Sequence, residues 1–117
     1  MPSYRVNEAA VRRARQLIDD GRVDDRTAWS DAAPDATAAN ALIDAEGFDA
    51  FAAWHLAEDP DASEGTKGRY AFPYGDFRTV NRAALIHAKQ RASQNHHDAI
   101  ERVADELLQR LDAHREG

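Results

Sequence analysis

Apolar residues recur at helical spacing in two well-separated parts of the chain. In the later part they form one wide stripe: Ile100, Val103, Ala104, Leu107, Leu108 and Leu111. A stripe of that width is typical of a helix that faces a globular core, because a two-stranded coiled coil uses a narrower seam. A shorter stripe within residues 11–18 predicts a first helix that begins after Asn7 and ends at Gly21.

Two more helices are indicated in the middle of the chain. The alanine-rich residues 34–47 predict one, with Gly47 as its C-terminal glycine. Asp49 then starts a short helix that carries Phe51, Trp54 and Leu56. Only residues 69–74 alternate with period two, and one strand alone cannot form a sheet. We therefore expect an all-α fold, a helical bundle of about five helices that forms a single domain over residues 1–117.

An irregular aromatic arm is expected at residues 67–78, before the fourth helix. Four of the nine aromatic residues of the chain lie within eight positions of this arm: Tyr70, Phe72, Tyr74 and Phe77. Such density predicts burial. Pro73 and Gly75 favour an extended segment that turns sharply, and Asp76 is placed to cap the helix that runs through Ala92.

Composition narrows the class of protein. With 117 residues the chain is long enough for one core and too short for two. It contains no cysteine, which excludes disulfides and thiolate metal sites and fits a reducing cytoplasm. No apolar run approaches the roughly 20 residues that span a bilayer, and the first residues hold no apolar signal-peptide core. We expect a soluble cytoplasmic protein with no membrane contact.

Charge is distributed unevenly along the chain. Residues 16–64 hold two arginines against thirteen carboxylates, a net charge of −11, whereas residues 67–91 hold six basic residues against Asp76, a net charge of +5. The basic stretch can contact a polyanion, or it can pair with carboxylates of the same domain. Internal pairing is the favoured interpretation, and the overall charge of −6 opposes association with nucleic acid.

A basic stripe is the strongest functional signal in the sequence. Arg78 and Arg82 are one helical turn apart, and Lys89 follows two turns later. The preceding arm adds two basic and two aromatic candidates: Lys67, Arg69, Tyr70 and Tyr74. Cations beside aromatic rings can hold phosphates and stack on bases, or can contact a protein surface. We therefore expect a binding protein that uses residues 67–91 to contact a macromolecular partner or a second copy of itself.

Motifs for catalysis or metal binding are not evident. The five histidines lack the spacing that sets two ligands on one helical face, since His96 and His97 diverge by roughly 100°. We expect no metal and no cofactor, and an enzyme is not favoured. The alternative is a small-molecule or metal-dependent enzyme with a pocket around five residues: Trp54, His55, Tyr70, Tyr74 and His87. In that case His55 and His87 should converge.

Parts of the sequence resemble a family of small uncharacterised bacterial proteins. The resemblance lies in the block Tyr70-Ala71-Phe72-Pro73-Tyr74-Gly75-Asp76-Phe77-Arg78, in residues 4–10 and in Ala53-Trp54-His55-Leu56. It implies no activity, because none is assigned to that family. The turn at residues 72–76 and the two helices after it are also similar to a helical module of phage head-maturation proteins, although no protease region accompanies them.

Overall fold

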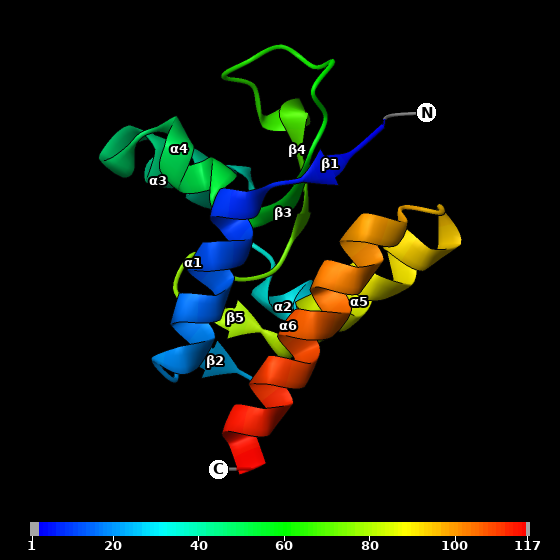
Figure 1. The fold of residues 1–117 in the computed structure, drawn as a ribbon. Helices are drawn as coiled ribbons and strands as arrows, with labels where there is room; N and C mark the ends of the chain where they lie inside the picture. Colours follow the sequence, from blue (N-terminus) through cyan, green and yellow to red (C-terminus); the bar gives the residue numbers. More distant parts are fainter. Residues whose placement is uncertain (1–2, 117) are drawn as a thin grey trace.

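The computed structural model describes residues 3–116, in which helices and strands are mixed (Figure 1). Six α-helices occur in these residues: α1 (Glu8–Asp19), α2 (Trp29–Ala32), α3 (Ala36–Glu46), α4 (Phe48–Ala52), α5 (Arg82–Gln94) and α6 (Asp98–Glu116). Five short strands accompany them: β1 (Arg5–Val6), β2 (Val23–Asp24), β3 (His55–Glu58), β4 (Tyr70–Pro73) and β5 (Val80–Asn81). A 3₁₀ turn spans Lys67–Arg69 just before β4.

The expectation of an all-α helical bundle is wrong, because the strands form two sheets. One sheet has three antiparallel strands in the order β1-β3-β4, in which Ala57 of β3 lies opposite Val6 on one side and Ala71 on the other. The second sheet is the parallel pair β2 and β5. Residues 69–74, where the sequence alternates with period two, contain β4, whereas the other strands show no such alternation in their two to four residues.

Strand β3 occupies residues that were expected to continue a helix. Helix α4 ends at Ala52 and β3 begins at His55, so Leu56 belongs to the central strand of the sheet. The first three residues of β3 are buried. A strand buried on both faces gives a short continuous apolar run, which periodicity cannot distinguish from a buried helix.

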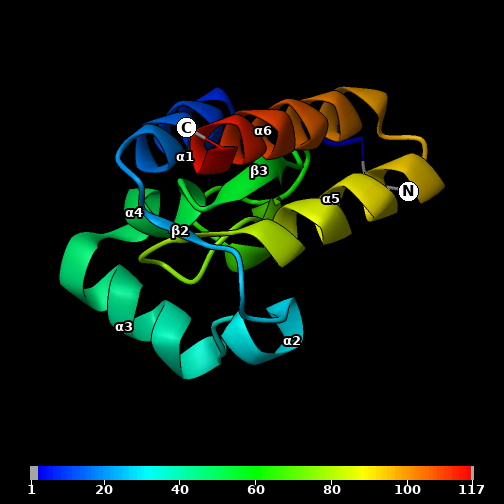
Figure 2. The same ribbon diagram turned by 90° about the horizontal axis from the view of Figure 1, so that it is seen from below.

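Helices α1 and α6 lie side by side over β3 and form the core with it (Figure 2). The two apolar stripes expected from the sequence are confirmed on these helices. The residues buried there are Val11, Ala14, Leu17 and Ile18 on α1, and Ile100, Ala104, Leu107, Leu108 and Leu111 on α6. Leu56 of β3 and Leu85 of α5 belong to the same core. Truncation of one of these leucines to alanine is expected to cost about 2–5 kcal/mol of stability.

Helix α6 is 19 residues long and amphipathic, with charged residues such as Arg102 and Glu106 on its exposed side. Across residues 3–116, none of the helices combines the length and the apolar character that a membrane crossing requires.

The aromatic arm becomes strand β4 and a tight turn, and the following helix begins later than expected. The Oδ1 atom of Asp76 accepts hydrogen bonds from the N–H groups of Arg78 and Thr79, at 3.0 and 2.7 Å. Asp76 therefore closes the turn and does not cap the helix. The cap of α5 is Asn81, whose Oδ1 atom accepts from the N–H of Ala84 at 2.9 Å.

Gly75 is required in this turn by the closeness of its neighbours. A Cβ atom on Gly75 would collide with the carbonyl oxygen of Thr79 and would lie 2.6 Å from Cζ3 of Trp54. Trp54 in turn stacks on Tyr74, with ring centroids 5.1 Å apart, and Tyr74 is completely buried. The prediction that this segment is buried is therefore confirmed at Tyr74.

Candidate functional site

Arg69, expected on the contact surface, is instead buried inside the fold. It is 8% exposed and donates a hydrogen bond of 2.9 Å to Oε2 of Glu58. It also donates to the carbonyl oxygens of Pro60 and Ala62. These hydrogen bonds hold the loop after β3 against the sheet. The Arg69 guanidinium therefore binds groups of the protein itself.

The cations of α5 that were expected to bind a partner pair with α6. Arg82 donates two hydrogen bonds to Asp112, at 2.9 and 3.1 Å, and Nζ of Lys89 lies 2.8 Å from Asp105. The hydrogen bond from Arg82 lowers the pKa of Asp112 below its ordinary value. Internal pairing is thus confirmed for both cations, although their partners lie on α6 and not in the acidic residues 16–64.

The other candidates of that surface are spread over different environments. Tyr74 is completely buried and Tyr70 is half-buried. Lys67 donates to the side chain of Asn40 at 2.6 Å. Of the seven residues expected on the surface, only Lys67 and Arg78 are exposed, so the structure does not gather the set on one face.

The two histidines of the alternative pocket also differ in environment. His55 is buried against the rings of Phe51 and Tyr70, and its Nδ1 atom lies 2.9 Å from the carbonyl oxygen of Phe51. Burial lowers the pKa of His55 to about 4, because the protonated ring would lose its hydration. His87 is exposed on α5 and lines a cleft to which neither His55 nor Trp54 contributes.

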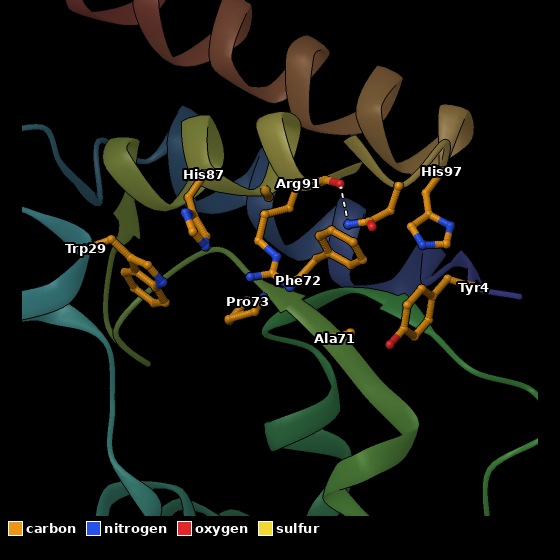
Figure 3. Close-up of a pocket in the computed structure, with 10 residues that line it drawn as sticks. Tyr4, Trp29, Ala71, Phe72, Pro73, His87, Arg91 and His97 are labelled. Atoms are coloured by element: carbon orange, nitrogen blue, oxygen red, sulfur yellow. Dashed lines mark hydrogen bonds between the residues drawn. The ribbon is translucent and has the colours of Figure 1, made fainter. Parts of the chain in front are cut away.

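This cleft has a volume of about 470 Å³ and lies between α5, β4 and α2 (Figure 3). Its lining residues are Tyr4, Trp29, Ala71, Phe72, Pro73, His87, Ala88, Arg91, Asn95 and His97. In Figure 3, Trp29 lies at one end of the cleft, Tyr4 and His97 lie at the other, and Arg91 points into the space between them. A cation is thus flanked by aromatic side chains on both sides.

Helix α5 and its C-cap residue supply the polar row of the cleft. His87, Arg91 and Asn95 follow one another at intervals of four residues and therefore share one helical face. The side-chain amide of Asn95 donates to the backbone carbonyl of Arg91 at 2.9 Å, the dashed line in Figure 3. Among the side chains that the structure describes, those of residues 3–115, the Arg91 guanidinium has no carboxylate at ion-pair distance, and none of the lining residues is acidic.

Three rings form one end of the cleft. The ring centroids of Tyr4 lie 5.6 Å from Phe72 and 5.1 Å from His97, and those of Phe72 and His97 lie 5.9 Å apart. All three pairs meet edge to face, an arrangement that aromatic rings prefer. Each of the three side chains is half-buried, so the cluster keeps a surface that faces the cleft.

Backbone in the left-handed region helps to shape this end. Phe72 has φ of 61° within β4, and His96 has φ of 60° after α5, a conformation that costs a residue with a side chain about 1–2 kcal/mol. The N–H groups of His96 and His97 donate to the carbonyl oxygens of Ser93 and Ala92, the pattern of a Schellman motif. This motif directs His97 back towards Phe72. Backbone strain of this kind is concentrated at functional sites.

The segment between β2 and α2 holds Trp29 at the other end. Oδ1 of Asp24 accepts hydrogen bonds from the N–H groups of Arg26 and Thr27, both at 3.0 Å, which closes a turn directly before α2. Trp29 is the first residue of α2, a short helix that contacts α5. The turn therefore brings the indole ring beside His87, as Figure 3 shows.

The sequence had indicated only one polar residue of this cleft, His87, and had grouped it with other partners. It missed Tyr4, Trp29, Arg91 and His97 as members of one site. The spacing of His87, Arg91 and Asn95 is the sequence feature that could have indicated this site. It places one amide and two groups that can bind an anion on the same helical face. The aromatic members come from separate segments that only the tertiary fold brings together.

The chemistry of the cleft suits binding. Its polar groups are one guanidinium, two imidazoles, one amide, the Tyr4 hydroxyl and the Trp29 indole N–H, and its lining contains no serine, threonine or cysteine. In the part of the chain that the structure describes, no three side chains of histidine, cysteine, aspartate or glutamate are grouped so that they could hold a metal ion.

Comparisons of the chain with protein-family models, with curated proteins and with solved structures gave no match. The resemblance to small bacterial proteins stays a prediction, and the function has to be argued from the geometry of the cleft.

Proposed function

We propose that this chain is a ligand-binding domain and that its ligand carries a negative charge next to a flat apolar body. The observation that carries the proposal is the position of Arg91 between the aromatic ends of a cleft, without a carboxylate partner among the side chains described, those of residues 3–115. The proposal keeps the expected binding role but moves the site from the surface of residues 67–91 to the cleft between α5, β4 and α2.

Electrostatics supports an anionic ligand. The protein carries a net charge of −6, and other cations such as Arg69, Arg82 and Lys89 are held by carboxylates of the fold. The exposed guanidinium of Arg91 can attract an anion from solvent, and the apolar walls of the cleft reduce the screening of the pair once the ligand is bound. The guanidinium also offers several N–H donors in a fixed fork.

Size and shape support a small ligand. The volume of about 470 Å³ lies in the range of sites that hold small molecules. Rings at both ends give stacking and edge contacts to a flat body. His87 and Arg91 are exposed, so a ligand can reach both from solvent. The absence of cysteine fits a cytoplasmic location, which we include in the proposal.

The test is a binding experiment with small aromatic acids. The indole N–H resonance of Trp29, assigned with Trp29→Phe, should shift when phenylacetate is added, and Arg91→Ala should weaken binding about tenfold or more. The matched control is Arg102→Ala, since Arg102 is exposed on α6 and does not line the cleft. Equal binding by the Arg91→Ala protein would overturn the proposal.

A further inference from the structure

We infer that the cleft selects a monocarboxylate with an aromatic body over a phosphate ester and over a neutral analogue. This inference rests on the proposed function, because it names the class of anion that the same site takes. It is drawn from the number of charges in the cleft, from the shape of the cation and from the aromatic ends.

The charge of the cleft matches one negative charge. Arg91 is the only arginine or lysine among its lining residues. A phosphate monoester carries about −1.5 to −2 charges at neutral pH, so most of its second charge would have no lysine or arginine against it. Next to the cleft, Tyr4 and His97 also line a second hollow, and Asp98 contributes a carboxylate there. That carboxylate and the net charge of −6 make excess negative charge unfavourable.

The shape of the cation matches a planar anion. A guanidinium can donate two parallel N–H···O bonds to the two oxygens of a carboxylate, and this pairing fixes the plane of the carboxylate. The imidazole of His87, one helical turn before Arg91 on the same cleft, can add one hydrogen bond. One of the two N–H donors of the Asn95 amide is taken by the Arg91 carbonyl, and the other stays available to a ligand.

The aromatic ends select the body of the ligand. Trp29 is half-buried at one end, and Tyr4, Phe72 and His97 form the other end. A flat aromatic body can stack on one ring or meet its edge, which adds to the energy of burying apolar area, whereas an aliphatic body gains the burial alone. The carboxylate is held at Arg91, between these ends (Figure 3).

The experiment compares four ligands of similar size with the intact protein. Phenylacetate, phenyl phosphate, benzyl alcohol and cyclohexylacetate are titrated at pH 8 while the Trp29 indole N–H is followed by NMR. We expect phenylacetate to bind about tenfold or more tightly than benzyl alcohol, because a hydrogen bond between charged groups is worth that factor. It should also bind more tightly than phenyl phosphate, whose second charge has no lysine or arginine against it. Cyclohexylacetate should bind more weakly than phenylacetate.

Two variants of one residue separate charge from shape. Arg91→Ala should remove the preference for phenylacetate over benzyl alcohol. Arg91→Lys keeps the charge, so it should keep the preference over benzyl alcohol, and it loses the fork, so it should weaken the binding of phenylacetate. Arg91 is exposed, and thermal melting of each variant checks that the fold is kept.

The outcomes distinguish this inference from the proposed function. If phenyl phosphate binds as tightly as phenylacetate and both depend on Arg91, the selectivity is refuted while the anion-binding cleft stands. If cyclohexylacetate binds as tightly as phenylacetate, the preference for an aromatic body is refuted while the anion-binding cleft stands. If none of the ligands shifts the Trp29 resonance, or if Arg91→Ala changes nothing, both the inference and the proposed function fail.

Discussion

The side-chain amide of Asn81 donates a hydrogen bond of 3.0 Å to the backbone carbonyl of Thr27, two residues before Trp29. The other end of the same amide caps α5, because Oδ1 accepts from the N–H of Ala84 at 2.9 Å. One completely buried side chain thus joins the segment that carries Trp29 to the helix that carries Arg91. The geometry of the cleft depends on these two hydrogen bonds of Asn81.

Replacement of Asn81 should therefore destabilise both the fold and the cleft. Asn81→Ala removes a helix cap and leaves the Thr27 carbonyl without this donor, which we expect to cost about 2–4 kcal/mol in chemical denaturation. Asn81→Ser keeps a capping oxygen and should cost less than alanine, while the Trp29 indole resonance moves in both variants. Equal stability of the alanine variant and the wild type would contradict this role.

Gly75 and Gly68 make a matched pair for the turn after β4. A Cβ atom at Gly75 would meet the Thr79 carbonyl and the Trp54 ring, so Gly75→Ala should lose about 1–3 kcal/mol. A Cβ atom at Gly68 has open space around it, so Gly68→Ala should change stability by less than about 0.5 kcal/mol. Thermal melting of the two variants side by side tests the difference. If Gly75→Ala leaves the melting temperature unchanged, the turn can accommodate a Cβ atom and this explanation of Gly75 is wrong.

His96 offers a stabilising change close to the cleft. Its left-handed backbone in the Schellman motif suits glycine, so His96→Gly should raise the free energy of unfolding by about 0.5–1 kcal/mol. The control is Gln94→Gly, two residues earlier at the last residue of α5, which should lower the free energy of unfolding. His96 does not line the cleft of Arg91, so ligand binding should be kept. A loss of stability in His96→Gly would mean that its imidazole makes a contact worth more than the strain.

The buried His55 should make the protein less stable in mild acid. Its pKa is lowered to about 4 by burial, below the ordinary 6.5, so the unfolded chain takes up the proton first as the pH falls. The stability that neutral His55 contributes is complete above pH 6.5 and is lost between pH 6.5 and pH 4, up to about 3 kcal/mol. Urea denaturation across this range measures the loss.

His55→Gln is the control for this pH dependence. The glutamine side chain does not titrate and can still donate to the Phe51 carbonyl, so the slope between pH 6.5 and pH 4 should flatten. Paired carboxylates such as Asp112, whose pKa is lowered by its hydrogen bond from Arg82, lose their contribution only at pH values below their ordinary 3.8. An unchanged slope in the variant would assign the acid sensitivity to other groups.

The sequence predicted the long helices well and the sheets not at all. Helices α1, α3 and α6 have wide stripes or clear end signals, such as Asn7 and Gly47, and local periodicity is sufficient to find them. The strands hold together by pairing residues far apart, such as Val6 with Ala57 and Ala57 with Ala71. Their two to four residues carry no local signal of that pairing.

The candidate site shows the same limit. The row of His87, Arg91 and Asn95 is a local pattern on one helix and could have been read directly. Tyr4 and Trp29 reach the cleft only through the pairing of β1 with β3 and through the joint at Asn81. Arg69 and Lys89 were named as contact residues although internal pairing was the favoured interpretation, because a sequence does not show which carboxylate neutralises which cation.

Tyr4 directly precedes β1, which is only two residues long and pairs with β3 through Arg5 and Val6. So short a strand is expected to detach and re-form far more often than the core unfolds. Detachment would carry away one wall of the cleft, and a bound ligand would hold that wall in place. Occupancy of the cleft should therefore slow hydrogen exchange at the Asn7 amide, which donates to the Leu56 carbonyl at 2.8 Å, while amides deep in α6 stay unaffected.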